Sequence, residues 1–314
     1  MSAKHHDASL IDQLPSARGR LEANAPLAKY TWFKAGGEAE VLFRPADEND
    51  LSEFLAGVGS DVPLTVIGNA SNLLVRDGGI AGVVIRLGAG FSEIEVAGLD
   101  LVAGAGAADL NVARKARDVG LAGLEFLSGI PGTIGGSVIM NAGAYGAEIR
   151  DICVSVRAVD RAGTPHEIAA YDIGFTYRHS DFPADMIVTG ARFRGVQGER
   201  DEITGRMEAI QSEREVTQPV RTPTGGSTFQ NPPGHKAWEL VDQAGCRGLR
   251  RGGAMVSELH CNFLINTGGA TAADLEGLGE EVRRRVFEHS GISLEWEIKR
   301  IGSLGDTDVK EIGE

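Results

Sequence analysis

The segment "GIPGTIGGSVIMNAGAYG", residues 129–146, packs six glycines and one proline around a single apolar run. Glycine inside a helix or strand costs about 0.5–1 kcal/mol relative to alanine, so this cluster indicates backbone that turns sharply or lies close against another group. Peptide N–H groups that converge on one point suit a phosphate. The segment is therefore compatible with a cradle for an extended phosphate-bearing ligand, and equally with a compact crossover in which glycines let strands pack closely.

A second candidate follows a short strand pattern in "TVIGNASNLLVRDGG", where five consecutive residues are small or hydrogen-bonding. They are Gly68, Asn69, Ala70, Ser71 and Asn72. Such residues can present N–H groups to a pyrophosphate, but they also dominate ordinary β-turns, and the pattern alone favours the turn. The nearby "GAGAAD" begins like the dinucleotide fingerprint G-x-G-x-x-G, but Asp109 replaces the third glycine, which argues against a Rossmann site.

Three further side chains could take part in acid–base or charge-stabilising chemistry, but they lie far apart in the sequence. Arg178 lies in "FTYRHSDF", Ser227 in "GGSTFQNPP" and Glu297 in "LEWEIKRIG". Taken separately they are typical of a surface ion pair, a turn hydroxyl and a solvated strand residue. A serine without a neighbouring His or Asp motif is a poor hydrolytic nucleophile. These residues form a site only if the fold brings them together.

Composition restricts the class of protein. The net charge of -13 argues against a nucleic-acid-binding surface. No apolar run reaches the roughly 18 residues of a membrane span, and the N-terminus lacks a secretory pattern, so we expect a cytoplasmic protein. Cys153, Cys246 and Cys261 are odd in number and widely spaced, which predicts neither a disulfide framework nor a metal site.

The elements that must position these residues begin with a strand-rich first half. Apolar runs predict strands at 64–67 and 82–87, and "LDLVAGAG" predicts another. In "DLNVARKARDVG", Leu110, Ala113 and Val119 have helical spacing, and Gly120 stands as a C-terminal stop. Residues 152–195 indicate antiparallel strands with a hairpin turn at "RAGT".

The second half contains more helix. A helix is predicted near residue 200, with Ile203, Met207 and Ile210 on one face, and the Pro- and Gly-rich stretch after Gln218 marks a boundary or a functional loop. Beyond it we expect a helix in "AWELVDQAG" and strands in "AMVSELHCNFLINTGG". An amphipathic helix in "TAADLEGLGEEVRRRVFEHSG" begins with Thr271 in capping-box spacing. The fold class is α+β, with a smaller C-terminal α/β unit.

Six motifs in this order and spacing resemble the UDP-N-acetylenolpyruvoylglucosamine reductases, flavoenzymes of bacterial peptidoglycan precursor synthesis. The resemblance covers the chain from about Tyr30 to Gly302. The motifs are "VIGNASNLLVRDGG", "GLEFLSGIPGTIGGSVIMNAGAYGAE", "YRHSDF", "GGSTFQNP", "AGCRGLRRGGAMVSELHCNFLIN" and "LEWEIKRIG". No tyrosine follows Tyr177, so the chain is similar to the shorter class without the extra loop whose tyrosine closes over the sugar nucleotide.

The resemblance implies a vanillyl-alcohol-oxidase-like FAD-binding fold of two α+β subdomains, followed by a C-terminal α/β substrate-binding domain. The expected division is an N-terminal extension at 1–25, FAD subdomains at 26–90 and 91–217, a substrate domain at 218–302 and a tail at 303–314. It also implies non-covalent FAD held by two loops. Their expected cofactor-binding residues are Gly68, Asn69, Ala70, Ser71, Asn72, Gly129, Pro131, Gly132, Thr133, Gly135, Gly136, Asn141, Gly143 and Gly146. Ala70 stands where many flavoproteins of this fold have glycine.

The implied reaction reduces an enolpyruvyl ether to a D-lactyl ether, with NADPH reducing FAD first. The resemblance assigns Arg178 to the substrate carboxylate, where a permanently charged fork stabilises the developing enolate. Glu297 assists that stabilisation and must be protonated to donate a hydrogen bond. Ser227 is the expected proton donor to the carbon beside the carboxylate.

Further substrate contacts are also implied by the resemblance. Tyr145 and Asn231 match residues of the substrate pocket, and in place of the tyrosine lid Arg214, or the cluster Arg247, Arg250 and Arg251, is a candidate cover for the diphosphate. We expect a cytoplasmic monomer that acts in cell-wall biogenesis, and thereby in cell shape and division, without nucleic-acid or membrane partners. Two alternatives stay open: a flavin oxidase or dehydrogenase of the same fold acting on another small molecule, and a non-catalytic flavin- or sugar-nucleotide-binding protein.

Overall fold

The computed structural model describes residues 9–305, and the segment 68–72 directly follows an edge strand of its first sheet. The strand order is β1-β2-β5-β3, with β1 and β2 antiparallel and the other pairs parallel. The bounds are α1 Leu10–Gln13, β1 Arg20–Pro26, η1 Leu27–Lys29, β2 Glu38–Arg44, α2 Glu48–Gly57, β3 Leu64–Ile67 and β5 Ile80–Arg86. The strands predicted at 64–67 and 82–87 are confirmed. Residues 20–25, which we had assigned to an extension, form most of β1.

The second sheet is antiparallel, with the order β12-β11-β13-β7-β6. Its strands are β6 Ile94–Ala97, β7 Asp100–Gly104, β11 Cys153–Asp160, β12 Pro165–Ala169 and β13 Met186–Arg194. The predicted hairpin at "RAGT" is confirmed, because β11 pairs with β12 and Gly163 has the positive φ (83°) that the turn requires. Small elements frame the sheet: η2 Ala89–Phe91, β8 Leu121–Ala122, β9 Gly143–Ala144, β10 Ala147–Glu148, α5 Ile149–Ile152, η4 Ala170–Asp172 and β14 Val196–Gln197.

The helices of this part are α3 Asp109–Asp118, η3 Glu125–Gly129, α4 Ile134–Ile139 and α6 Arg200–Thr217. The predicted stop at Gly120 is confirmed by its φ of 69°. The predicted apolar face of α3 was partly wrong, because the helix buries Val112, Ala113 and Ala116, whereas Val119 lies beyond the helix and is exposed. Tertiary packing, and not the spacing of the largest residues, decides which face is inside. In α6, Ile203, Met207 and Ile210 are buried as predicted.

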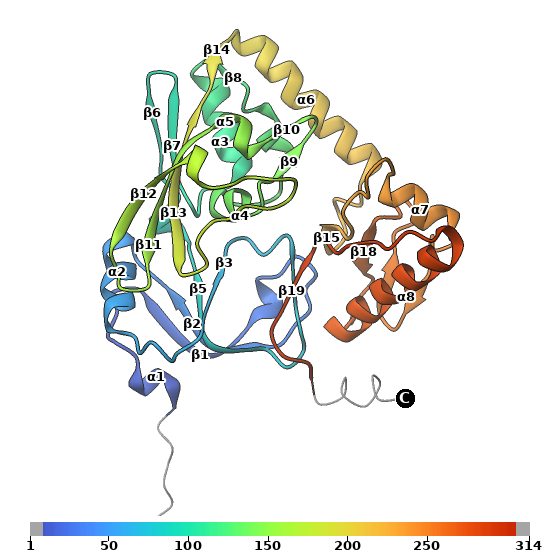
Figure 1. The fold of residues 1–314 in the computed structure, drawn as a ribbon, viewed down its shortest axis with the longest axis horizontal. Helices are drawn as coiled ribbons and strands as arrows, with labels where there is room; N and C mark the ends of the chain where they lie inside the picture. Colours follow the sequence, from blue (N-terminus) through green and yellow to red (C-terminus); the bar gives the residue numbers. More distant parts are fainter. Residues whose placement is uncertain (1–8, 306–314) are drawn as a thin grey trace, which may run out of the picture.

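The third sheet has the order β15-β18-β17-β16 and carries two helices. Its elements are β15 Thr224–Ser227, α7 Ala237–Gln243, β16 Arg250–Arg251, β17 Ala254–Val256, β18 Phe263–Asn266 and α8 Ala272–Ser290. The capping box is confirmed, since Thr271 accepts from the Asp274 N–H and Asp274 accepts from the Thr271 N–H. Residues Leu275, Leu278, Val282 and Val286 bury the inner face of α8. Figure 1 shows α6 leading from the second sheet to this unit, which forms a separate lobe.

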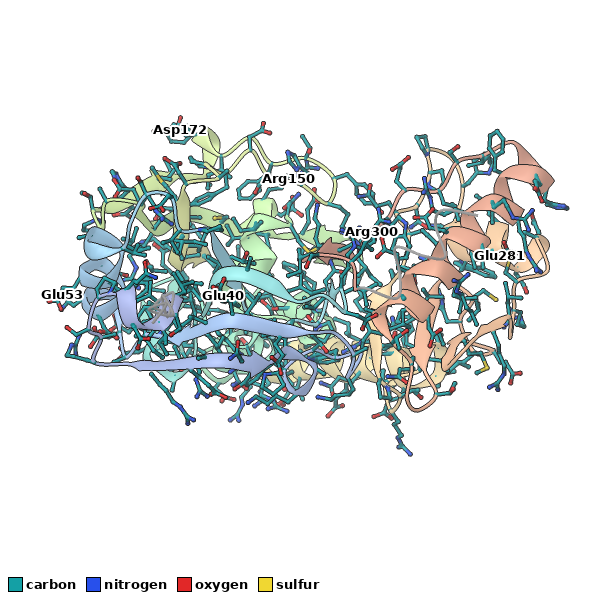
Figure 2. The ribbon with its side chains drawn as sticks, turned by 90° about the horizontal axis from the view of Figure 1, so that it is seen from below. Glu40, Glu53, Arg150, Asp172, Glu281 and Arg300 are labelled. Atoms are coloured by element: carbon teal, nitrogen blue, oxygen red, sulfur yellow. The ribbon has the colours of Figure 1, made fainter. Side chains whose placement is uncertain are left out.

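The chain then returns to the first unit. Strand β19 Lys299–Ile301 pairs in parallel with β4 Leu73–Val75, and in Figure 1 it lies between the lobe of α8 and the first sheet. Asp77, just after β4, accepts hydrogen bonds from the Ala272 and Ala273 N–H groups at the start of α8 (3.0 and 2.9 Å). In Figure 2, Glu281 on α8 and Glu53 on α2 lie at opposite ends of the molecule.

Buried side chains form three clusters. The largest joins the first two sheets, because residues of α2 and β5 such as Phe54 and Ile85 pack in one cluster with Leu101 and Phe193 of the second sheet. A second fills the C-terminal unit and also takes in Phe33 and Leu74 from the first part of the chain. A third covers the other face of the first sheet. Both junctions between units are thus packed with apolar side chains, which holds the cavity walls together.

Candidate functional site

A cavity of about 1540 Å³ opens where the three units meet. It is larger than the roughly 300–1,000 Å³ typical of sites for one small ligand, so it has room for two large ones. Its wall includes residues 68–72, which we call the first loop, and most of residues 129–146, which we call the second loop. Residues of α6, β15 and the segment before β19 complete it.

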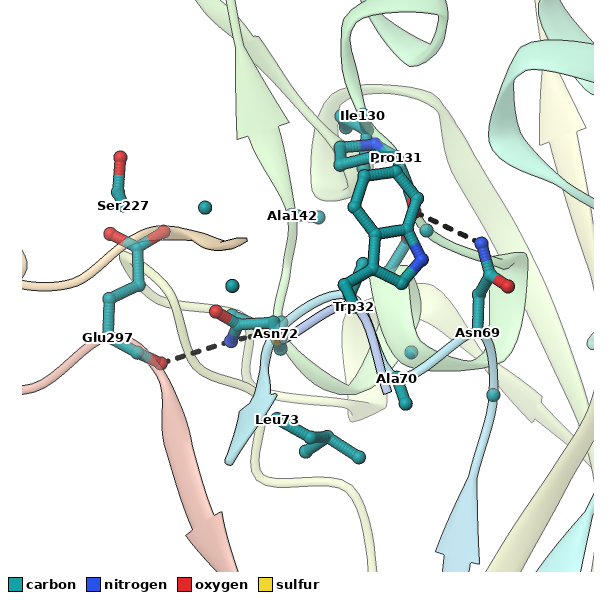
Figure 3. A pocket seen from close by; sticks show the side chains of 18 of the residues that line it. Trp32, Asn69, Ala70, Asn72, Leu73, Ile130, Pro131, Ala142, Ser227 and Glu297 are labelled. Atoms are coloured by element: carbon teal, nitrogen blue, oxygen red, sulfur yellow. Dashed lines mark hydrogen bonds between the residues drawn. The ribbon is translucent and has the colours of Figure 1, made fainter. Parts of the chain in front are cut away.

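The two loops touch each other at the cavity wall. The Asn69 Nδ2 donates to the Pro131 carbonyl oxygen at 3.4 Å, and Figure 3 shows this bond beside the indole of Trp32. A Cβ at position 68 would collide with the Thr133 hydroxyl, so only glycine allows the loops to approach this closely. Ala70 has φ 49°, in the left-handed region, which explains why glycine suits this position in related folds.

The second loop has the features of a ligand cradle. A Cβ on Gly136 would meet no protein atom within 4 Å, although Gly136 lines the cavity, so bare backbone faces open space there. The Thr133 hydroxyl is buried without a hydrogen-bond partner among the described residues. A free donor and exposed peptide groups beside a large cavity fit a phosphate-bearing cofactor such as FAD.

A buried carboxyl supports the second loop from behind. The Ser137 hydroxyl donates to Asp109 Oδ2 at 2.9 Å, and the Asp109 N–H donates to the Gly132 carbonyl at 3.3 Å. Burial raises the pKa of Asp109 to about 7, although the Ser137 hydroxyl and backbone N–H groups oppose the shift. Position 109, where the dinucleotide fingerprint would have its third glycine, thus carries a carboxyl that supports the second loop.

Arg178, Ser227 and Glu297, far apart in the sequence, all line the cavity, and we call this group the reaction corner. The Arg178 Nε donates to Glu297 Oε1 at 3.1 Å, and both side chains are mostly buried. In Figure 3, Ser227 and Glu297 appear on the same side of the pocket. Burial raises the pKa of Glu297, and the neighbouring Arg178 charge only partly offsets this. The corner therefore combines a fixed cation with a carboxyl that keeps its proton to a higher pH than usual.

Backbone conformation and backbone hydrogen bonds fix the position of the reaction-corner residues. Arg178 has φ 56° and lies in a tight turn closed by reciprocal Thr176 and His179 backbone hydrogen bonds (2.9 and 3.2 Å). Ser227 ends β15, and Glu297 donates its N–H to the Thr228 carbonyl at 2.8 Å. A non-glycine residue at positive φ is sparsely populated, so the surrounding structure must hold Arg178 in place.

Most of the predicted site residues line the cavity. The exceptions are Asn141, Gly146 and Asn231. Asn141 is fully buried, donates to Glu148 and to the Thr176 carbonyl, and so supports the turn that carries Arg178. Asn231 is exposed, and its Oδ1 accepts from the Ala237 N–H at the start of α7. Both asparagines serve local backbone groups, which motif matching alone cannot distinguish from ligand contacts.

The candidate diphosphate contacts differ in accessibility. Arg214 lines the cavity, has Gln218 as its hydrogen-bond partner (3.3 Å) and forms no ion pair among residues 9–305. Burial lowers the pKa of Arg214. Tyr145 has φ 55°, and its hydroxyl lies 3.4 Å from the carbonyl oxygen of Ile210 on α6. Arg247 also lines the cavity but is paired with Asp242. Arg250 and Arg251 lie on β16, outside the cavity wall.

Several aromatic cavity residues were not predicted, among them Trp32 and His260. Trp32 lines the cavity beside the two loops, and the aromatic stretch "YTWF" was the available signal. His260 also lines it; burial lowers the pKa of His260, and its Nδ1 accepts from the Asn262 N–H at 3.2 Å. The proton of a neutral imidazole with this partner is on Nε2. No spacing pattern in the sequence pointed to His260.

Comparison with known proteins agrees with this geometry. A family model described as "FAD binding domain" matches residues 39–169, and one described as "UDP-N-acetylenolpyruvoylglucosamine reductase, C-terminal domain" matches residues 218–301. Proteins named UDP-N-acetylenolpyruvoylglucosamine reductase are similar over nearly their whole length. The one from Parvibaculum lavamentivorans is 61% identical over 302 residues (96% of this chain, 97% of that protein), and the one from Azorhizobium caulinodans 63% over 294 (94% and 96%). The crystal structure of the Thermus caldophilus UDP-N-acetylenolpyruvylglucosamine reductase has a TM-score of 0.79 at 36% identity and covers 91% of this chain and 100% of its own.

Proposed function

The chain belongs to the UDP-N-acetylenolpyruvoylglucosamine reductase family, and from this premise we propose how its cavity carries out the reaction. The protein is an FAD-containing oxidoreductase that reduces the enolpyruvyl ether of UDP-N-acetylenolpyruvoylglucosamine to UDP-N-acetylmuramate, in peptidoglycan precursor synthesis. NADPH is the co-substrate that fits this activity. The observation that carries the assignment of roles is the reaction corner beside two glycine-rich loops.

The two loops are the proposed FAD site. The first loop, with Gly129, Pro131, Gly132, Thr133, Gly135, Gly136 and Gly143 of the second, supplies cavity-facing backbone and one unpaired hydroxyl. FAD held by these residues would supply the redox chemistry, that is, the uptake of reducing equivalents from NADPH and the transfer of hydride to the substrate alkene. Asn141 and Gly146, which lie outside the cavity wall, we assign to the support of this loop and of the Arg178 turn.

Arg178 and Glu297 are the proposed binding groups for the substrate carboxylate. The Arg178 Nε is occupied by Glu297, so its terminal nitrogens remain for a carboxylate, on which negative charge grows as the alkene accepts hydride. The buried Glu297, when protonated, can donate a hydrogen bond to the same group. Both interactions strengthen as the enolate develops and therefore accelerate the reaction.

Ser227 is the proposed proton donor. Its hydroxyl lies at the reaction corner, where the carbon beside the substrate carboxylate must be placed if Arg178 holds that carboxylate. A hydroxyl approaching from one fixed side protonates one face of the enolate, which sets the D configuration of the lactyl product. Tyr145 and Arg214, on the cavity wall, are the proposed contacts of the diphosphate.

We also propose the cellular setting. Cys153, Cys246 and Cys261 are free thiols, which fits a reducing compartment such as the cytoplasm. Within residues 9–305, no helix is both long and apolar enough to cross a membrane. The enzyme is proposed to act as a monomer, because one chain supplies both cavity loops and the whole reaction corner. Its product supports the cell wall, and through it cell shape and division.

The test is an anaerobic two-step titration of the holoenzyme. NADPH should bleach the flavin absorbance, and UDP-N-acetylenolpyruvoylglucosamine should restore it. Bleaching without recovery would leave a flavoenzyme with another substrate, and oxygen consumption with small alcohols would identify an oxidase. Flavin that NADPH cannot reduce would indicate a binding protein without turnover.

A further inference from the structure

Asn72, the last residue of the first loop, directs its side-chain amide toward Glu297 and toward Met140 of the second loop. Its Nδ2 lies 3.0 Å from the Glu297 carbonyl oxygen and 3.0 Å from the Met140 sulfur. Figure 3 shows the bond to Glu297 crossing from the first loop to the segment before β19. A primary amide has two N–H groups, and both have protein acceptors here, so the Asn72 side chain has no donor left for a phosphate or a flavin.

The acceptor of this bond is the backbone of a reaction-corner residue. The Glu297 N–H donates to the Thr228 carbonyl at 2.8 Å, and Thr228 directly follows Ser227. The Glu297 carbonyl accepts from Asn72, whose own carbonyl accepts from the Lys299 N–H at 3.0 Å. The backbone of Glu297 is therefore fixed between the strand that carries Ser227 and the first loop, while its carboxyl meets Arg178.

We propose that Asn72 is a positioning residue for Glu297. Its amide fixes the Glu297 peptide, and with it the direction of the carboxyl toward Arg178 and the substrate carboxylate. This inference rests on the proposed function, because it assigns Asn72 to the step that Glu297 serves. The first loop thus has two tasks: its backbone lines the cofactor cavity, and its last side chain orients the acid of the reaction corner.

Asn69 offers a matched control from the same loop. It is also an asparagine whose side-chain donor contacts the second loop, at the Pro131 carbonyl, but unlike Asn72 it has no hydrogen bond to Glu297. Loss of the Asn69 amide should weaken FAD binding. Loss of the Asn72 amide should instead impair the reaction with the enolpyruvyl substrate.

The experiment compares Asn72→Ala, Asn72→Asp and Asn69→Ala in FAD-loaded enzyme. Three quantities are measured: the FAD dissociation constant, the rate of flavin reduction by NADPH, and the rate of flavin reoxidation by UDP-N-acetylenolpyruvoylglucosamine. In both Asn72 variants, reoxidation should slow roughly 10- to 100-fold, because small misplacements of a reacting group have effects of this size. FAD affinity and flavin reduction should change less than about 3-fold, because the first loop faces the cofactor site with its backbone, which these substitutions leave in place.

The aspartate variant separates hydrogen bonding from packing. Aspartate has nearly the shape of asparagine but no N–H donor, so Asn72→Asp should slow reoxidation at least as much as Asn72→Ala. Near-normal reoxidation in Asn72→Asp would overturn the proposal. So would equal slowing of both half-reactions, or a loss of FAD affinity matching that of Asn69→Ala.

A second measurement does not depend on turnover. The Glu297 carboxyl can be titrated by carbon-13 NMR in the oxidised holoenzyme, with Glu297→Gln used to assign its signal. Asn72→Ala should lower the pKa of Glu297 toward its ordinary value, because a released side chain regains contact with water. An unchanged Glu297 pKa would count against the positioning role. If wild-type enzyme failed to reoxidise with the substrate, the proposed function would fail, but this titration would still test Asn72.

Discussion

The two loops bind mainly through backbone groups, whereas the reaction corner binds through side chains. The loops present backbone: Gly136 leaves open space, Gly68 makes room for Thr133, and hydrogen bonds between them are few. The corner presents polar side chains from three distant segments, those of Arg178, Ser227 and Glu297, and the turn that carries Arg178 is strained. A long cofactor can be held by many small backbone contacts, whereas a developing charge needs a few side chains at fixed positions.

The largest effect is expected from Arg178→Ala. Loss of the only proposed cation at the substrate carboxylate should slow flavin reoxidation by about 10³-fold, the scale seen when one group that stabilises developing charge is removed. FAD affinity and reduction by NADPH should stay near wild type, which single-turnover absorbance measures. An equal fall in both half-reactions would contradict the assignment of cofactor binding to the two loops and of the substrate reaction to the reaction corner.

Glu297 tests whether the corner needs a neutral donor. Glu297→Gln should retain the reoxidation rate within about 10-fold, and Glu297→Ala should lose about 10²-fold, as for other positioned hydrogen-bond and proton-transfer groups. Burial raises the pKa of Glu297, so the protonated form persists to higher pH than usual, and the rate should fall as pH rises through that pKa. Glu297→Gln should abolish this fall. Equal collapse of both variants would rule out the neutral-donor role.

Asp109 tests whether the buried carboxyl beneath the second loop titrates in the folded protein at an unusually high pH. The Asp109 carboxyl has a pKa of about 7 in the folded protein, so it keeps a proton that the unfolded chain releases near pH 4. The free energy of unfolding should therefore fall as the pH rises from about 4 to about 7. The expected loss from pH 5 to pH 7 is about 2 kcal/mol. Urea unfolding should show a flatter pH dependence in Asp109→Asn. A wild-type slope in that variant would mean that other groups titrate.

Gly136→Ala should give the smallest effect and the sharpest contrast. Without FAD the variant should gain about 0.5–1 kcal/mol of stability, because alanine favours the helix. Its methyl group would enter the cavity, so FAD affinity should fall about 10-fold, as for a contact worth 1.4 kcal/mol. Gly205 is the matched control: it lies in α6, and a Cβ there also meets no protein atom within 4 Å, but it is outside the cavity wall. Gly205→Ala should leave flavin fluorescence titrations unchanged.

The contrast between the regions also explains what could be predicted. The second loop was visible in the sequence because close backbone approach leaves a local excess of glycine, and α8 was visible because its capping box and apolar period are local. The reaction corner depends on packing between distant segments, so only family resemblance suggested it. Asn141, Asn231 and Asn72 show the limit of motifs, since each amide bonds to a protein backbone group, and for Asn141 and Asn72 only the folded chain brings that group near.

Pairing of β19 with β4 has a consequence for synthesis on the ribosome. The partners Lys299 and Leu73 are separated by most of the chain, so the first unit has only part of its final structure while the second and third are being made. At a synthesis rate of about 5–20 residues per second, β19 leaves the ribosome roughly 10–50 s after β4. Glu297 reaches the cavity with β19. The residues of both FAD loops therefore leave the ribosome well before Glu297, so the reaction corner is the last part of the cavity to be completed.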